Sequence, residues 1–269
     1  MTLELLVACV AKDVHELVKT MNIGSNAVIV NQKSDYAYEE FEYAGNRVKA
    51  LSMQEKGVGL SRTTALQRAT ADIVLFSDED IVYENGYAEK VIQAFEENPK
   101  ADVILFNVKV EEARRTYWIE NAKRVHRWNC GRYPAYSIAV RTKRLHEVGL
   151  TYHLWFGGGA LFSCGEDSMF LNDALKLGLK MYAVPVTIGK EVARSEGEAS
   201  TWFNGYNKKF FYDRGVLYHY LYGGLAPVMT LRFLLKNKGT MCKDISYAEA
   251  KKLMKQGAKE RTPWNGDKE

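Results

Sequence analysis

The sequence predicts an α/β fold in which a mostly parallel central sheet is flanked by helices. Apolar runs rich in β-branched residues alternate with helical patterns along most of the chain, and this alternation is typical of a parallel sheet covered by helices. With 269 residues, of which 46% are apolar, the chain can bury a sizeable core. Acidic residues appear directly after one of the apolar runs, as expected at the carboxyl end of a strand.

The individual elements follow from the local patterns in order. The apolar runs predict strands at 5–11, 27–31, 47–53, 72–78 and 102–110. The helical patterns between them predict helices at 14–21, 61–71 and 87–99. Ser61 is expected to cap the second of these helices, and Pro99 to close the third.

The second half of the chain is less regular. Residues 109–136 are irregular and aromatic, and 136–150 predict a strand, a turn and a short helix that ends at Gly149. Residues 165–186 predict a helix followed by a strand. Beyond Gly205 the pattern is helical and aromatic, so we expect one α/β domain at 1–204 and a helical extension at 205–269.

Composition excludes several classes of protein. The four cysteines show neither a disulfide framework nor a metal-site spacing, which favours a reducing, cytoplasmic location. Glu4 interrupts the N-terminal apolar stretch, so a buried strand is expected there and not a signal sequence. No apolar stretch reaches the roughly 20 residues of a membrane span. The net charge is only +4, but the C-terminal part of the chain is basic. That part carries no nucleic-acid motif, so no nucleic-acid partner is expected.

The apolar run at 73–76 leads directly into three consecutive carboxylates. Asp78 and Asp80 would lie on the same side of an extended chain, with Glu79 facing away as a bystander. A Mg²⁺ or Mn²⁺ ion that carries a diphosphate would relieve the repulsion between the two aspartates. The alternative is a solvated loop whose acids cap the next segment.

A second acidic pair lies at the expected start of a helix. Glu166 and Asp167 follow a glycine-rich loop that can shape itself around a ligand. The helix dipole favours acids at this position in any protein, so Asp167 taken alone is equally well explained as a capping residue. Together with the upstream acids, it becomes a candidate general base.

These two segments carry a family resemblance. "EKGVGLSRTTALQRATADIVLFSDEDIV" resembles the Asp-x-Asp segment of inverting family 2 glycosyltransferases, and "GEDSMFLNDALKLGLKMY" is similar to their Glu-Asp motif. The likeness runs from Leu3 to about Ile188 in the family's order. It implies a single nucleotide-sugar-binding domain of the GT-A type.

The resemblance also implies a role for each matching residue. Asp80 would hold a Mn²⁺ or Mg²⁺ ion that bridges the donor diphosphate, and Asp78 would lie near the metal or the ribose. Arg62 would lie near the nucleotide. Asp167, beside Glu166, would deprotonate an acceptor hydroxyl in a single displacement that inverts the anomeric centre.

The strand at 27–31 departs from the family pattern. It ends in Asn31 and Gln32, where the family usually has acidic residues that contact the base. Both amides can donate and accept hydrogen bonds at a nucleobase edge. The identity of the nucleobase is therefore not determined, and uridine diphosphate is the default that the resemblance implies.

The candidate acceptor residues and the C-terminal region each allow two interpretations. Trp155 and His153 could stack on or hydrogen-bond an acceptor sugar, or could form part of the core. The aromatic and basic helices beyond 205 could rest on an anionic bilayer, at the inner face of the membrane, and bring the site to a lipid-linked acceptor. They could equally pack on the catalytic domain or on a second subunit.

We therefore expect a metal-dependent inverting glycosyltransferase that transfers a sugar from a nucleotide-diphosphate donor to a saccharide or lipid-linked acceptor. Surface polysaccharide biosynthesis is the expected context. A sugar nucleotidyltransferase is the first alternative, but "VACVAKDVHE" lacks the glycine-rich basic loop that a triphosphate needs. A non-catalytic nucleotide-sugar-binding or scaffold protein is the second, and it would not need Asp167.

Overall fold

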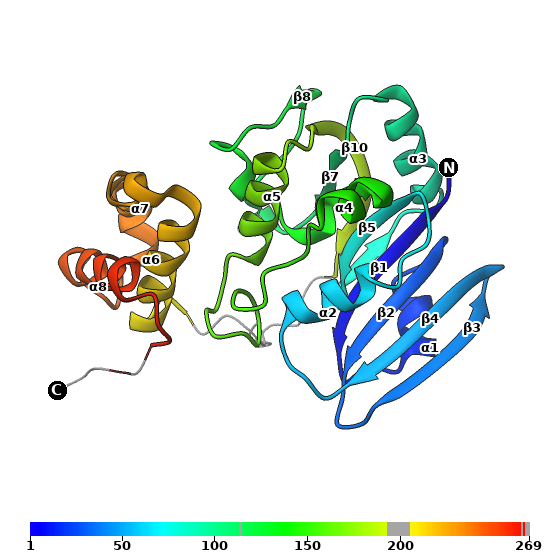
Figure 1. Ribbon diagram of the computed structural model, residues 1–269, viewed down its shortest axis with the longest axis horizontal. Coiled ribbons are helices and arrows are strands. Elements are labelled where there is room, and N and C mark those ends of the chain that lie inside the picture. The colour runs from blue at the N-terminus through cyan, green and yellow to red at the C-terminus, as the bar shows by residue number, and fades with distance from the viewer. Residues whose placement is uncertain (113–114, 193–204, 265, 267–269) are drawn as a thin grey trace.

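The computed structural model describes residues 1–112, 115–192, 205–264 and 266, and its centre is a ten-stranded sheet (Figure 1). The strand order is β3-β4-β2-β1-β5-β9-β7-β10-β6, and β8 pairs with β10 beside this path. The strands are β1 (Leu3–Val10), β2 (Asn26–Gln32), β3 (Ala37–Tyr43), β4 (Asn46–Met53), β5 (Ile73–Asp78), β6 (Ile81–Tyr83), β7 (Val103–Lys109), β8 (Lys123–Arg124), β9 (Ile138–Arg141) and β10 (Met181–Glu191).

Helices cover both faces of this sheet, and three more form a group at one end (Figure 1). The helices are α1 (Val14–Thr20), α2 (Val58–Leu66), α3 (Tyr87–Glu97), α4 (Thr142–Val148), α5 (Glu166–Lys176), α6 (Lys208–Tyr222), α7 (Ala226–Met241) and α8 (Tyr247–Glu260). Short 3₁₀ turns lie at Cys130–Arg132, Ala135–Ser137 and Gly223–Leu225.

Each face of the sheet has its own hydrophobic core. Successive side chains of a strand point to opposite faces, so Leu5 packs in the core beneath α1 and α3, whereas Leu6 packs in the core beneath α2, α4 and α5. Both leucines are fully buried. This explains why β1 is a continuous apolar run and not an alternating one.

The predicted elements are largely present, with three corrections. The sheet is mixed: β4, β2, β1 and β5 are parallel as expected, but β9 pairs antiparallel with both β5 and β7. A hairpin partner for β4 was not expected, yet β3 pairs with it antiparallel. Helix α2 begins at Val58 with Gly57 as its N-cap, so Ser61 lies inside the helix and does not cap it.

The C-terminal helices α6, α7 and α8 enclose a third core. That core also contains Phe156, Phe162 and Met169 from the segment around α5. The helical extension beyond residue 205 therefore packs on the part of the chain that precedes it, which is one of the two arrangements expected for it. No helix within the described residues is both long enough and apolar enough to cross a membrane.

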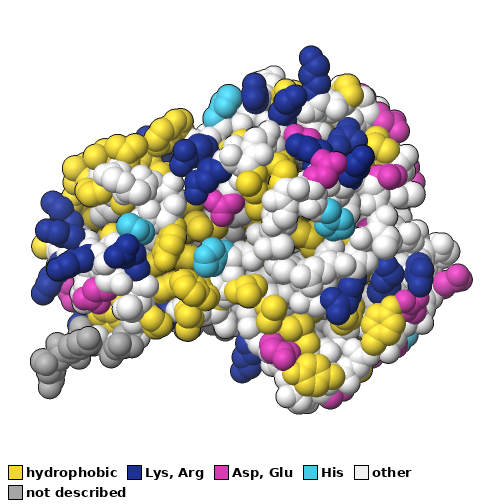
Figure 2. All heavy atoms as spheres, viewed as in Figure 1, with side chains coloured by type: hydrophobic (Ala, Val, Ile, Leu, Met, Phe, Trp, Pro, Cys, Tyr) yellow, Lys and Arg dark blue, Asp and Glu magenta, His cyan; other side chains and the backbone are white. Residues whose placement is uncertain are grey.

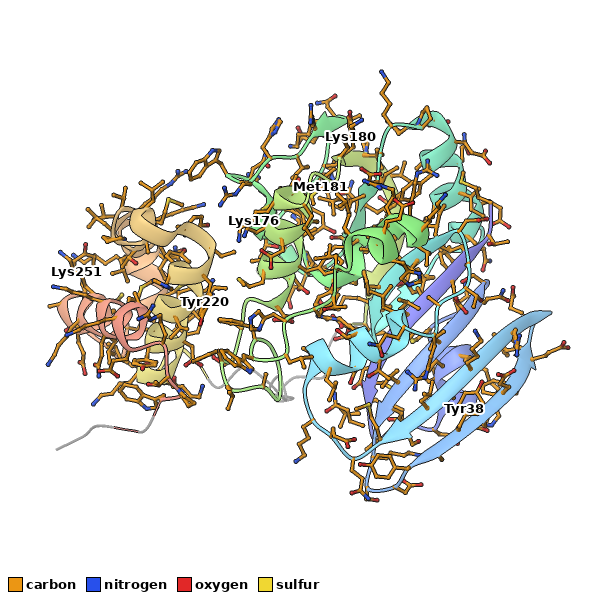
Figure 3. The ribbon with its side chains drawn as sticks, in the orientation of Figure 1. Tyr38, Lys176, Lys180, Met181, Tyr220 and Lys251 are labelled. Carbon is orange, nitrogen blue, oxygen red and sulfur yellow. The ribbon has the colours of Figure 1, made fainter. Side chains whose placement is uncertain are left out.

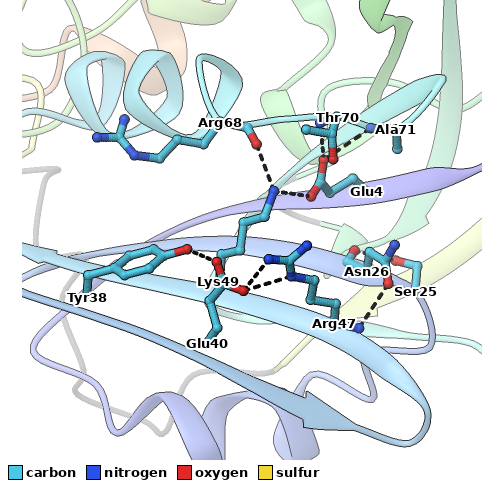
Figure 4. Close-up of polar contacts among 10 residues, drawn as sticks. All are labelled: Glu4, Ser25, Asn26, Tyr38, Glu40, Arg47, Lys49, Arg68, Thr70 and Ala71. Atoms are coloured by element: carbon cyan, nitrogen blue, oxygen red, sulfur yellow. Dashed lines mark hydrogen bonds and ion pairs between the residues drawn. The ribbon is translucent and has the colours of Figure 1, made fainter.

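A buried ion pair connects the start of β1 to the segment that enters β5 (Figure 4). Glu4, which is 2% exposed, accepts hydrogen bonds from the backbone N–H of Thr70 at 2.6 Å and of Ala71 at 3.3 Å. Lys49 of β4 places its Nζ 3.6 Å from Glu4 and donates to the carbonyl of Arg68 at 3.0 Å. The pair holds β1, β4 and the residues just after α2 together at the amino end of β1.

Replacing Lys49 with methionine should lower the free energy of unfolding by about 3 kcal/mol, because the buried Glu4 carboxylate would lose its counter-charge. Arg47→Met is the matched control on the same strand, since Arg47 pairs with Glu40 while 62% exposed. Its loss should stay under about 1 kcal/mol. Urea unfolding measures both, and equal losses would contradict a special role for the buried pair.

Candidate functional site

The carboxyl ends of β1, β2 and β5 meet at one edge of the sheet, where the register pairs Ala8 with Asp78. A cavity of about 410 Å³ opens there, a size typical of small-molecule sites. It contains residues of both acidic motifs, far apart in sequence. Its walls are formed by Ala8, Cys9, Val10, Gln32, Val58, Arg62, Asp78, Glu79, Asp80, Gly158, Ser163, Cys164, Gly165, Glu166 and Asp167.

Arg62, on α2, joins the two acidic motifs. Its side chain is only 3% exposed, and its guanidinium lies 2.6 Å from Asp78 Oδ1, 2.9 Å from Asp167 Oδ1 and 3.2 Å from Glu166 Oε1. Although burial disfavours its charge, the carboxylates hold the pKa of Arg62 well above its usual value. One cation thus faces three carboxylates, which leaves an excess of two negative charges if all three are ionised.

The ring of Tyr152 supports this guanidinium. The Arg62 Cζ lies 5.2 Å from the ring centroid, and Tyr152 in turn stacks on Phe170 of α5 at 4.4 Å. Since both rings are buried, Arg62 cannot turn away from the carboxylates without leaving a packed environment. The expectation that Arg62 lies near a nucleotide remains a prediction, and its direct partners in the structure are acids.

Asp167 lies in the first turn of α5, and its pKa is raised. Withdrawal from water, reinforced by Glu166, raises the pKa of Asp167 to about 8, while Arg62 opposes this shift. Its Oδ1 is bonded to Arg62, and the side chain is 22% exposed toward the cavity. When it is ionised, a carboxylate with such a pKa is a stronger base than an ordinary aspartate, which suits proton abstraction from a hydroxyl.

Asp78 ends β5, and the chain then turns through Glu79 and Asp80 before β6. Both aspartates line the cavity. Glu79 is not a bystander, because its Oε2 accepts the N–H of Val10 at 2.7 Å and its Oε1 lies 3.2 Å from Lys12 Nζ. The strict alternation expected of an extended chain fails here because the strand stops at Asp78.

A divalent cation fits this donor set if its ligand supplies the remaining oxygens. The described residues contain no group of three or more acidic, histidine or cysteine side chains arranged to hold a metal alone. Asp78 and Asp80 offer hard carboxylate oxygens in the same cavity. Mg²⁺ is commonly held by one or two carboxylates together with substrate phosphates, so two aspartates and a diphosphate would together fit such a site.

The two amides at the end of β2 have different roles. Asn31 is fully buried and uses its amide to bond the Lys12 backbone, accepting from N–H at 3.2 Å and donating to C=O at 2.7 Å. It supports the turn after β1 and does not line the cavity. Gln32 does line it, and also borders a neighbouring hollow with Lys33, Ser34, Asp35, Gln54 and Lys56.

The two candidate acceptor residues lie on the loop before α5. The ring of Trp155 is 49% exposed and meets the ring of His153 edge-on at 5.6 Å. Burial lowers the pKa of His153. Tyr220 of α6 lies 6.2 Å from His153, on the side of α6 that faces the rest of the molecule (Figure 3). The three rings form an aromatic surface, but none of them lines the cavity.

Asp213 on α6 is a site-supporting residue that the sequence patterns missed. It is fully buried, and its Oδ2 accepts from Ser163 N–H at 2.9 Å and from Ser163 Oγ at 2.8 Å, beside Lys209. Lys209 also donates to the carbonyl of Leu161 at 3.0 Å. An acid within the apolar helix "FFYDRGVLYHY" was the available signal, because such a residue must have partners inside the fold.

Leu217, one turn further along α6, lies against Gly165, the N-cap of α5. A Cβ on Gly165 would lie 2.4 Å from Leu217 Cδ2, and Gly165 has a φ of +109°, so both space and backbone conformation require glycine there. The loop that presents Glu166 and Asp167 is therefore seated on α6. The C-terminal helices are part of the site's support.

Substituting Arg62 with methionine should lower the free energy of unfolding by about 3–5 kcal/mol, because three carboxylates would lose their shared cation. Adding Asp167→Asn to Arg62→Met should recover part of that loss by removing one of the repelling charges. Denaturant unfolding of the single and double variants measures both effects. Arg68→Met, an exposed arginine just beyond α2, should change stability by less than about 0.5 kcal/mol. If the double variant recovered none of the lost stability, the interpretation that Arg62 holds three mutually repelling carboxylates would be contradicted.

Asp213→Ala should cost about 2–3 kcal/mol, because it frees the buried N–H and hydroxyl of Ser163. Hydrogen exchange should rise at 157–165 more than in β1 or β5. Lys208→Ala, which breaks a pair with Glu249 that is 42% exposed on both sides, is the control and should have little effect. A stability loss without selective exchange at 157–165 would show that Asp213 does not hold this loop.

The chain is similar to solved structures in fold. The crystal structure of S. aureus TarS 1-349 in complex with UDP-GlcNAc matches with a TM-score of 0.62 and 15% identity, over 91% of this chain and 74% of that chain. The structure of S. aureus TarS 1-349 alone matches with a TM-score of 0.63 and 13% identity, over 97% and 82%. No curated protein matches the chain in sequence.

The predicted fold class is confirmed as an α/β domain of the GT-A type, with the mixed sheet described above. A family model described as "Glycosyl transferase family 2" matches residues 14–164. This range includes Arg62, Asp78 and Asp80, and it ends shortly before Glu166. It covers more than half of the protein, and the chain therefore belongs to glycosyl transferase family 2.

Proposed function

We propose that the protein is a metal-dependent inverting glycosyltransferase that moves a sugar from a nucleotide-diphosphate donor to a hydroxyl of its acceptor. The observation that carries the proposal is the contact of one buried arginine with both motifs. Through Arg62, the acid at the end of β5 and the acids at the start of α5 face the same cavity. A binding module would have no need for a strengthened base in the same cavity as a diphosphate site.

The reaction needs a base on one side of the anomeric carbon and charge stabilisation on the other. Asp167 would take the proton as the acceptor oxygen forms its bond to the anomeric carbon, and the bond to the diphosphate oxygen breaks with its electron pair leaving on the diphosphate. Asp78 and Asp80 would hold Mn²⁺ or Mg²⁺, which supplies positive charge to the departing diphosphate. A single displacement of this kind inverts the anomeric centre.

The donor proposed is a UDP-sugar. S. aureus TarS has been crystallised with UDP-GlcNAc and with UDP, and its similarity in fold supports this default. Gln32 separates the acid-lined cavity from the hollow formed by 33–35, Gln54 and Lys56, which is open enough for a nucleoside. The Gln32 side chain donates from Nε2 to Ser61 Oγ at 3.1 Å and accepts the N–H of Gly57 on Oε1 at 3.3 Å. These two bonds set the orientation of its amide before a nucleobase binds.

The proposed acceptor is a saccharide or a lipid-linked sugar. The surface formed by His153, Trp155 and Tyr220 supports this, because exposed aromatic faces suit the apolar face of a sugar ring. The proposed setting is surface polysaccharide biosynthesis on the cytoplasmic side of a membrane.

Two variants test the proposal separately. Asp167→Asn should bind UDP-sugar and Mn²⁺ as the parent does but lose about 10²–10⁴-fold in transfer, because it cannot accept the proton. Asp80→Asn should lose the rise in unfolding temperature that UDP-sugar and Mn²⁺ give together. Asp173→Asn, in α5 but outside the cavity lining, is the matched control and should retain both properties.

Thermal unfolding with a panel of nucleotide sugars, with and without Mn²⁺, identifies the donor, since a ligand that binds the folded state raises the midpoint. Product analysis then reports transfer and anomeric configuration. Full transfer by Asp167→Asn would refute its role as the base. Unchanged metal-dependent donor binding by Asp80→Asn would place the metal elsewhere, and a retained anomeric configuration would contradict a single displacement.

A further inference from the structure

Helix α7 exposes an apolar stripe on its outer side. Val228 and Leu235 are each 62% exposed, Leu231 is 41% exposed, and Leu225 just before the helix is 50% exposed. At about 100° per residue, Val228, Leu231 and Leu235 fall within about 60° of one another around the helix axis. The opposite side of α7 is packed, because Ala226, Thr230 and Leu234 are buried.

Cations border this stripe on both sides. By the same helical periodicity, Lys236 lies about 80° from Val228 in one direction and Lys238 about 80° in the other, with Arg232 next to Val228. Arg232, Lys236 and Lys238 are exposed, and α7 contains no acidic residue. Figure 2 shows hydrophobic side chains gathered over the α7 end of the molecule, with lysines and arginines beside them.

This arrangement fits a binding surface that has an apolar interior and an anionic outer layer. A helix that lies in a membrane interface has an apolar strip in the acyl boundary and lysines or arginines at its edges among the headgroups. A surface that binds a protein partner would be expected to carry charges of both signs, whereas the charges on α7 are all positive. Helix α7 lies outside the residues 14–164 that match the family model.

We propose that the exposed face of α7, formed by Val228, Leu231 and Leu235 with Arg232, Lys236 and Lys238, binds the surface of an anionic lipid bilayer. The helix lies on the bilayer and does not cross it. Because α6 connects this helix to the loop before α5, the contact also fixes the candidate site relative to the membrane. The inference does not depend on the proposed reaction, because lipid binding is measured without substrate.

Vesicle sedimentation with the full chain tests the inference. Vesicles of phosphatidylcholine with about 30% phosphatidylglycerol should retain the protein, and phosphatidylcholine alone should retain far less, because the cations need anionic headgroups. Raising the salt concentration should weaken the retention by screening the charges. The triple variant Val228→Ser, Leu231→Ser, Leu235→Ser should bind at least about tenfold more weakly, since it loses its buried apolar contacts.

The matched control separates α7 from a general positive charge. Arg232→Gln, Lys236→Gln, Lys238→Gln removes three cations from α7, and Lys251→Gln, Lys252→Gln, Lys255→Gln removes three exposed cations from α8. Lys251 lies on the outer side of α8 (Figure 3). The α7 variant should lose most of its binding and the α8 variant little. All substituted residues are exposed, so circular dichroism should show each variant folded.

Two outcomes would overturn the inference. Equal losses from the α7 and α8 charge variants would mean that no defined face binds. A parent protein that ignores anionic vesicles and elutes as a dimer, which the serine variant converts to a monomer, would show that the stripe binds a second copy of the chain. Transfer assays with a water-soluble acceptor report the proposed reaction separately.

Discussion

The buried guanidinium of Arg62 is the interaction on which the rest of the site depends. It is held between carboxylates from the end of β5 and the start of α5, and it is the only cation that directly pairs with these three acids among the described residues. Carboxylates this close to one another repel, and the low polarity around Arg62 makes both the repulsion and the pairing stronger than they would be in water. The arginine lets the two acidic motifs share one cavity in the folded chain.

The remaining negative charge gives the site its chemical character. Burial first, and then the neighbouring acids, raise the pKa of Asp167, so three acids against one cation disfavour full ionisation. The same excess would attract a divalent cation and favour its retention with a diphosphate. The proposed base and the proposed cation site would therefore both follow from one electrostatic imbalance. Neither would arise from Asp78 or Asp167 in isolation, since each acid alone could be solvated or could cap a helix.

The C-terminal helices support this arrangement from outside the matched family region. Asp213 and Leu217 of α6 fix the segment from Ser163 to Gly165, immediately before Glu166. Helix α6 packs against α8 and α7 on its other sides. The three-helix group therefore supports the loop, while one face of α7 stays exposed. A surface contact at α7 and the position of the acids at α5 are thus connected through one packed core.

Local patterns predicted most of the central strands and the helices between them, because burial on one or two faces leaves a readable periodicity in β1, β5, α3 and α5. They also indicated Asp78, Asp80, Glu166 and Asp167 as candidate residues, because runs of acids at element ends are visible in the sequence, and the structure places all four around one cavity. They could not determine the direction of β9, because a strand buried on both faces reads alike in either direction. They could not show that Asn31 serves the Lys12 backbone, that Glu79 holds the end of β1, or that Asp213 anchors the Ser163 loop. Those roles are hydrogen bonds and ion pairs between residues distant in sequence, and only the tertiary structure brings their partners within reach.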